Sequence, residues 1–205
     1  MEQFATEEQQ VEAIKRFWKD HGTAIIVGAV IGLGALWGWR YYSQTQIEAQ
    51  ESASTQYQTA IEAVEQENGL STIETFIKNN EATGYAHIAG LVAAQQAVEN
   101  GDLDTAASHL KTIMTSADSH IATIAGLRLA RVQLELQQAD AALSTLDKLD
   151  NDSFAAEIND VKGDIYVSQQ KFDDARMAYT SALEKRSNDR LLQMKLDNLS
   201  VAAGS

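Results

Sequence analysis

The longest apolar run in the chain lies close to its start. Residues 23–42 read TAIIVGAVIGLGALWGWRYY, with no ionisable side chain between His21 and Arg40. As a helix, Thr23 to Trp39 would be about 26 Å long, at the short end for crossing the hydrocarbon core of a bilayer. Aromatic residues flank the run as they flank membrane helices: Trp18 before it, and Trp37, Trp39, Tyr41 and Tyr42 at its end. The pattern predicts a transmembrane helix over residues 23–42.

A cleavable export signal and a buried core helix are the two alternatives for this run. The run is longer than the about 7–15 apolar residues of most signal peptides, and its leader carries Glu2, Glu7, Glu8 and Glu12. The bulky sequence WRYYSQTQ stands where a cleavage site would fall, and core helices seldom have aromatic residues gathered at both ends. These features favour an uncleaved signal-anchor.

Basic residues around the run predict its orientation. Three of them, Lys15, Arg16 and Lys19, precede it, whereas Arg40 alone follows and the next is Lys78. Because the flank richer in lysine and arginine stays in the cytoplasm, residues 1–22 are predicted to be cytoplasmic, and residues from about Ser43 onward are predicted to face the other side of the membrane. The leader itself predicts a short amphipathic helix that ends at Gly22, either bound at the membrane surface or solvated.

Glycines in the run form two small-xxx-small spacings. The pairs are Gly28 with Gly32 and Gly34 with Gly38. This spacing lets two membrane helices approach closely, although glycine is also common in membrane helices without such a contact. The glycines are therefore candidate contacts to another membrane helix.

Beyond the run, apolar residues recur at helical spacing and the pattern repeats. Residues 43–69 predict a long first helix that acts as a linker and ends at the Asn68-Gly69 turn pair. Three later stretches, 101–113, 138–149 and 171–183, each follow an amphipathic helix and place a small alanine four residues before a large apolar residue. The alanines are Ala106, Ala142 and Ala175, at steps of 36 and 33 residues. Two helices per unit at this period predict a helical solenoid, with an ordinary helical bundle as the alternative.

The third unit resembles the tetratricopeptide repeat. Its matching positions are Gly163, Tyr166, Phe172, Ala175, Tyr179 and Ala182. The second unit has Ala130 and Gln133 where the family places glycine and an aromatic residue, and the first has Ala94 and Ala97. The predicted fold is all-α: one transmembrane helix, a tetratricopeptide-like solenoid over residues 70–187, and a capping helix with tail over 188–205.

Composition agrees with this fold and excludes several functions. The 205 residues contain no proline and no cysteine, which favours helices and excludes disulfides, thiolate nucleophiles and sulfur-based zinc sites. The net charge of −13, with basic residues scattered singly through the repeats, argues against nucleic acid as a partner.

Candidate catalytic chemistry is sparse. The four histidines form no pair at helical spacing, and no glycine-rich phosphate loop follows a strand. One set of carboxylates shares a helix face, and a solvated acidic face is the favoured interpretation: Glu157, Asp160 and Asp164. The sequence predicts no enzyme, no cofactor, no metal and no small-molecule substrate.

Protein binding remains as the predicted activity. In tetratricopeptide arrays the first helix of each unit lines a concave surface, and this resemblance implies a groove that suits an extended or helical segment of basic character. No basic clamp for a C-terminal carboxylate is visible. The candidate groove residues are Gln95, Glu99, Arg131, Glu135, Asp160 and Asp164.

Nearly the whole chain resembles the bacterial YfgM family. The most specific stretches are QVEAIKRFW, GALWGWRYY and LRLARVQLELQQADAAL. The resemblance implies a single-span inner-membrane protein that associates with the Sec translocon and with PpiD, a membrane-anchored periplasmic chaperone, and helps pass exported chains to chaperones. A membrane-anchored scaffold that holds a signalling or envelope-assembly protein in its repeat groove is the alternative. A cytoplasmic enzyme would require the repeats to face inward.

Overall fold

A computed structural model describes residues 7–64, 66, 69–81 and 83–202. The chain divides into two units, Met1–Ser52 and Ala53–Ser205. The described residues are helical throughout, joined by short turns, and contain no strand. Helix α1, Glu7–Glu62, begins in the first unit and ends in the second.

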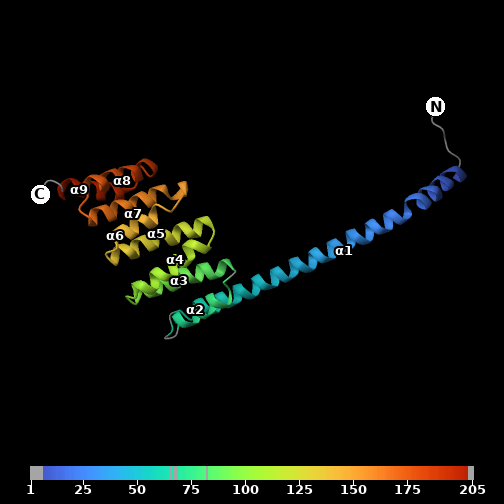
Figure 1. The fold of residues 1–205 in the computed structure, drawn as a ribbon, viewed down its shortest axis with the longest axis horizontal. Coiled ribbons are helices and arrows are strands. Elements are labelled where there is room, and N and C mark those ends of the chain that lie inside the picture. The colour runs from blue at the N-terminus through green and yellow to red at the C-terminus, as the bar shows by residue number, and fades with distance from the viewer. Residues whose placement is uncertain (1–6, 65, 67–68, 82, 203–205) are drawn as a thin grey trace, which may run out of the picture. The chain divides into compact units, whose positions relative to one another are not determined.

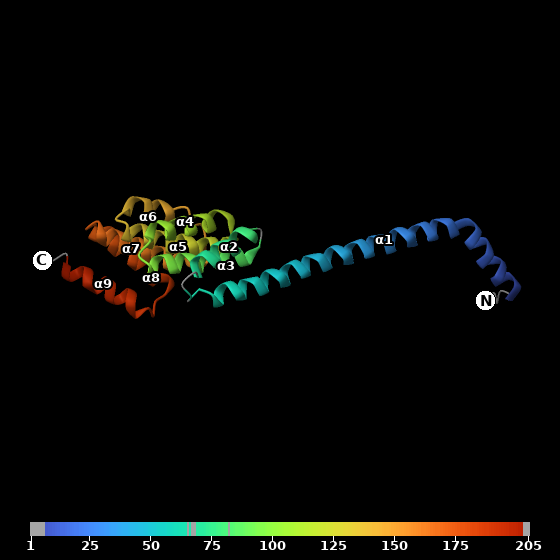
Figure 2. The same ribbon diagram turned by 90° about the horizontal axis from the view of Figure 1, so that it is seen from below.

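In the first unit, α1 continues through Gly22, so the predicted helix end at this glycine is wrong. Glycine weakens a helix interior by about 1 kcal/mol relative to alanine, but does not end the helix unless the backbone after it turns away. Here the missing Cβ makes room for Trp18, because a Cβ on Gly22 would lie 2.9 Å from Cε3 of that indole. Figure 2 shows α1 bending within its dark-blue part, near the N-terminal end.

The apolar side chains that the structure describes between residues 25 and 42 are not part of a core. Among the described residues, one helix is long and apolar enough to cross a membrane, and almost none of its most apolar stretch is buried. Its branched aliphatic residues between positions 25 and 36 are 42–68% exposed. The interpretation as a buried core helix of this chain is therefore wrong.

The second unit contains three antiparallel helix pairs in chain order (Figure 1). They are α3 (Gly84–Glu99) with α4 (Leu103–Ser116), α5 (Ser119–Glu135) with α6 (Ala139–Leu146), and α7 (Ala155–Ser168) with α8 (Phe172–Lys185). The end of α1 and α2 (Gly69–Asn79) come before them, the short 3₁₀ helix η1 (Asp152–Phe154) leads into α7, and α9 (Arg190–Ala202) follows. This arrangement confirms the predicted helical solenoid.

The turns within the three pairs repeat the same geometry. Each has one residue with positive φ, namely Gly101 (77°), Gln137 (62°) and Gln170 (59°), at the steps of 36 and 33 residues seen for the alanines. The next residue donates its backbone N–H across the turn, from Asp102 to the Ala97 carbonyl at 2.8 Å and equivalently in the other two. Such left-handed turns bond the last carbonyls of a helix and redirect the chain.

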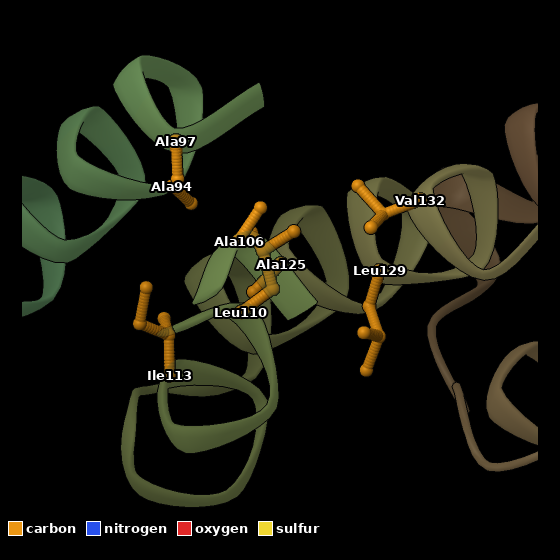
Figure 3. Close-up of a cluster of buried hydrophobic side chains, with 8 residues drawn as sticks. All are labelled: Ala94, Ala97, Ala106, Leu110, Ile113, Ala125, Leu129 and Val132. Atoms are coloured by element: carbon orange, nitrogen blue, oxygen red, sulfur yellow. The ribbon is translucent and has the colours of Figure 1, made fainter. Parts of the chain in front are cut away.

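Separate apolar clusters fill the spaces between successive helices, as expected of a solenoid in which each unit contacts its neighbours. Figure 3 shows the cluster between α3, α4 and α5. The predicted small residues Ala106, Ala142 and Ala175 are fully buried, and the large residues four positions later are at most 3% exposed. A Cβ on Gly163 would overlap the Tyr179 ring, so glycine lets α7 and α8 approach closely.

Candidate protein-binding surface

A hollow of about 270 Å³ lies between the first helices of two successive units, α3 and α5. It brings together two of the predicted groove residues, Gln95 and Arg131. The remaining lining is mostly apolar: Leu91, Ala94 and Val98 from α3, Leu110 from α4, and Arg128 and Val132 from α5. Ala94, Leu110 and Val132 also belong to the buried cluster drawn in Figure 3.

Arg128 is a member of this surface that the sequence-based prediction missed. It precedes Arg131 by three residues and therefore shares its helix face, a spacing that could have identified it. Both arginines are exposed, and neither guanidinium lies within ion-pair distance of a carboxylate anywhere in the described part of the chain.

The two predicted glutamates occupy different surroundings. The Glu99 carboxylate accepts hydrogen bonds from the amides of Gln95 (2.9 Å) and Gln96 (2.7 Å) on the same helix. Glu135 is exposed at the last residue of α5. Glu99 thus holds Gln95 at one end of the hollow.

The predicted carboxylates of α7 lie beside α9 and are bonded to it. Lys195 Nζ donates to Asp160 Oδ1 at 2.7 Å and to both Asp164 oxygens at 2.7 and 2.8 Å. The Tyr179 hydroxyl donates to Asp164 Oδ1 at 2.7 Å. These side chains are only 18% (Asp160), 33% (Asp164) and 23% (Lys195) exposed. The expectation of a solvated acidic face is therefore wrong for Asp160 and Asp164.

This cluster shifts two pKa values in the same direction. Burial, then the hydrogen bond to Asp164, raises the pKa of Tyr179. Burial alone would lower the pKa of Lys195, but the hydrogen bonds to Asp160 and Asp164 outweigh it, and the pKa is raised. Both shifts favour the neutral phenol and the charged lysine that join α9 to α7 and α8. The cluster therefore stabilises the end of the solenoid.

We predict that Lys195→Met loosens α9. Asp160 and Asp164 would lose a charged donor while remaining partly buried, which costs about 1–2 kcal/mol and makes amide hydrogen exchange in α9 about tenfold faster. The exposed Lys185→Met is the matched control and should leave exchange unchanged. Equal exchange in all three proteins would contradict the role of Lys195.

The same cluster predicts that the stability of α9 falls in strongly alkaline solution. The folded-state pKa values of Lys195 and Tyr179 are raised. The stabilisation that these two groups give is therefore fully present below their unfolded-state pKa values, about 10 for tyrosine and 10.4 for lysine. It is lost as the pH rises through the raised folded-state values. The exchange difference between wild type and Lys195→Met should be constant at neutral pH and narrow only in strongly alkaline solution.

A second hollow, of about 310 Å³ between α2, α3 and α4, contains two histidines. His87 Nε2 and Ser116 Oγ are 3.2 Å apart, and His109 Nε2 lies 3.7 Å from Glu74 Oε1. Among the described residues, no group of three or more histidines and carboxylates is placed to hold a metal ion. These contacts join neighbouring helices of the solenoid.

The four glycines of the apolar run lie along α1 in open space, since a Cβ on any of them would meet no atom within 4 Å. At about 100° per residue, the Gly28–Gly32 pair and the Gly34–Gly38 pair lie on faces about 120° apart. The two pairs thus offer two separate small-residue surfaces.

Paired helices with repeated left-handed turns define a helical-repeat protein of the tetratricopeptide type, and the same chain carries an exposed apolar helix. A family model described as a tetratricopeptide repeat-like domain matches residues 15–201. The chain is 38% identical over 207 residues to the ancillary SecYEG translocon subunit of Escherichia coli (strain K12), covering 98% of this chain and 100% of that protein. It is 37% identical over 198 residues to the protein of the same name from Haemophilus influenzae (strain ATCC 51907 / DSM 11121 / KW20 / Rd), covering 94% of this chain and 97% of that one. The chain belongs to the family of ancillary SecYEG translocon subunits.

A solved structure has a similar arrangement of helices. It is described as the first TPR of Spaghetti (RPAP3) bound to the HSP90 peptide SRMEEVD, with a TM-score of 0.51, 17% identity, and coverage of 58% of this chain and 96% of that chain. At this identity the similarity concerns the fold alone. Family and fold together indicate an accessory protein-binding role of a non-catalytic kind.

Proposed function

We propose that this protein is a membrane-anchored accessory factor of the Sec translocon that links exported chains to periplasmic chaperones through protein–protein binding. The similarity over 98% of the chain to a protein named as an ancillary SecYEG translocon subunit carries the proposal. A periplasmic chaperone of the PpiD type is the proposed second partner. The mostly apolar hollow between α3 and α5, with Val98 exposed at its rim, supports binding of protein segments.

The proposed orientation places the N-terminus in the cytoplasm and the repeats in the periplasm. The three basic residues before the apolar run, against one after it, support this direction. In this orientation the repeats lie in the compartment that exported chains enter as they leave the channel.

Photo-crosslinking in living cells tests the proposal. A photoreactive amino acid is introduced at exposed positions along α3, α5 and α7, and the crosslinked products are identified. We expect Sec channel subunits, a periplasmic chaperone and exported chains among the products. Recovery of a signalling or envelope-assembly protein with none of these three would contradict the proposal and favour the scaffold alternative.

We also predict that Gly28→Leu with Gly32→Leu weakens a lateral contact to a membrane partner without preventing insertion. The added side chains would separate the helix backbones, and a loss of about 1 kcal/mol corresponds to about fivefold less Sec subunit recovered from solubilised membranes. Ile26→Leu with Val30→Leu is the matched control. Unchanged recovery in the glycine variant, with normal insertion, would mean that these glycines contact no partner.

A further inference from the structure

The candidate groove residues are mostly acidic, but most of their carboxylates already have partners within the protein. The carboxylates of Asp160 and Asp164 already share the ammonium group of Lys195, and Glu99 accepts two amide hydrogen bonds. By contrast, Arg128 and Arg131 are without an ion pair in the described chain, and both line the apolar hollow between α3 and α5. The available charge at this hollow is therefore positive, in a protein with a net charge of −13.

Three basic side chains of the second unit are paired with a carboxylate at 2.6–3.3 Å: Lys162 with Asp147, Arg176 with Asp173, and Arg186 with Glu157. Others among the described residues, such as Lys111 and Lys148, have no ion pair either, so what sets Arg128 and Arg131 apart is that both line the mostly apolar hollow. Even Glu135, one helical turn after Arg131, is outside ion-pair distance of it. Arg128 and Arg131 thus keep their donors for an external acceptor, and the planar guanidinium groups suit carboxylates.

The hollow itself selects an aliphatic side chain. Its volume, about 270 Å³, is below the range of about 300–1,000 Å³ typical of small-molecule sites and leaves room for one or two side chains of a peptide. Five of its eight lining residues are apolar, and Val98 at its rim is 42% exposed. Covering this surface with an aliphatic group would remove apolar area from water.

The acidic and basic groups near the hollow lie on opposite sides of it. The Glu99 carboxylate lies on α3, at the side of Gln95 and Val98, and repels a second carboxylate there. The arginines lie on α5, at the opposite side of the hollow. A segment bound here would place its apolar side chain against Leu91 and Val98 of α3 and its carboxylates toward α5.

We propose that the hollow between α3 and α5 binds an extended protein segment in which one aliphatic side chain has glutamates or aspartates within a few residues of it. This assignment deepens the proposed function, and rests on it in taking protein segments as the ligands. It differs from the basic partner expected from the sequence, because Lys195 already neutralises the acidic residues of α7.

Fluorescence anisotropy with the full-length protein in detergent micelles tests the proposal. The probe is a fluorescein-labelled peptide of eight residues, with one leucine followed two residues later by two glutamates in a background of serine and glycine. We expect saturable binding that weakens about fivefold when the glutamates become glutamines, and again when the leucine becomes serine. Absence of saturable binding, or equal affinity for the glutamate and glutamine peptides, would overturn the proposal.

Protein variants locate the binding. Arg128→Gln with Arg131→Gln should weaken the glutamate peptide about fivefold, whereas the exposed Arg176→Gln should leave its affinity unchanged. Both changes are on the surface, and equal thermal unfolding by circular dichroism verifies the fold. Unchanged peptide affinity in the double variant would overturn the assignment to this hollow.

Co-purification of the wild-type protein with Sec subunits, measured in parallel, separates this inference from the proposed function. Failure of Sec recovery with intact peptide binding contradicts the proposed function alone. Failure of peptide binding with intact Sec recovery contradicts the hollow alone.

Discussion

Replacing Val30 and Leu33 with arginine should release the protein from membranes. The seven branched aliphatic residues of the run contribute roughly −2 to −4 kcal/mol on the insertion scale, whereas each arginine near the centre of the helix costs about 2.5–3.5 kcal/mol. The balance therefore becomes unfavourable. In a sucrose flotation gradient the wild-type protein should rise with the membranes, and the variant should remain in the dense soluble or aggregated fractions.

Two arginines placed elsewhere provide the control for added charge. Ser108 and Glu184 are exposed on α4 and α8, so Ser108→Arg with Glu184→Arg should float like the wild-type protein. If Val30→Arg with Leu33→Arg also floats, the apolar run is not the membrane anchor.

The second large effect is expected at Gly163. Gly163→Leu would force a side chain into the Tyr179 ring, which the hydrogen bond to Asp164 holds in place. Overpacking of this kind costs about 1–3 kcal/mol, and a leucine exceeds the space by several atoms. We therefore expect the free energy of unfolding to fall by about 3 kcal/mol, although leucine has a better helix propensity than glycine. Thermal unfolding of the detergent-solubilised protein, followed by circular dichroism, should shift to lower temperature by about 6–12 °C.

Gly84→Leu is the matched glycine control, because a Cβ there would meet no atom within 4 Å. It should leave the unfolding temperature unchanged or raise it. In the double variant Gly163→Leu with Tyr179→Ala, the small side chain makes room, so Gly163→Leu should cost much less than in the wild-type background. An equal cost in both backgrounds would contradict the close approach of α7 and α8 at this glycine.

The helical pairs could be predicted from the sequence because their signal is local. Apolar spacing identifies each amphipathic helix, and the recurring alanines Ala106, Ala142 and Ala175 mark positions where two helices cross closely. These alanines are all fully buried. The left-handed turns were harder to predict, because Gly101 carries the usual sequence signal while Gln137 and Gln170 adopt the same conformation without it. In those turns the backbone hydrogen bonds to Gln133 and Tyr166 fix the geometry.

The surroundings of the candidate site depend on contacts that no local pattern reports. Lys195 meets Asp160 and Asp164 across 35 and 31 residues of chain, so a carboxylate face that looks solvated in the sequence is paired in the fold. At Gly22 the sequence pattern predicted a helix end that the structure does not have. A glycine after an amphipathic stretch resembles a helix end, but the following residues also favour a helix and α1 continues.

Chemical labelling of single cysteines tests the central claim, an outward-facing repeat behind a membrane anchor, most directly. The protein contains no cysteine, so Glu12→Cys and Ser187→Cys, both at exposed positions, each introduce a unique thiol on either side of the apolar run. In intact spheroplasts, a membrane-impermeant maleimide should label Ser187→Cys and should label Glu12→Cys only after lysis. Labelling of Glu12→Cys in intact spheroplasts, with Ser187→Cys protected until lysis, would contradict the account.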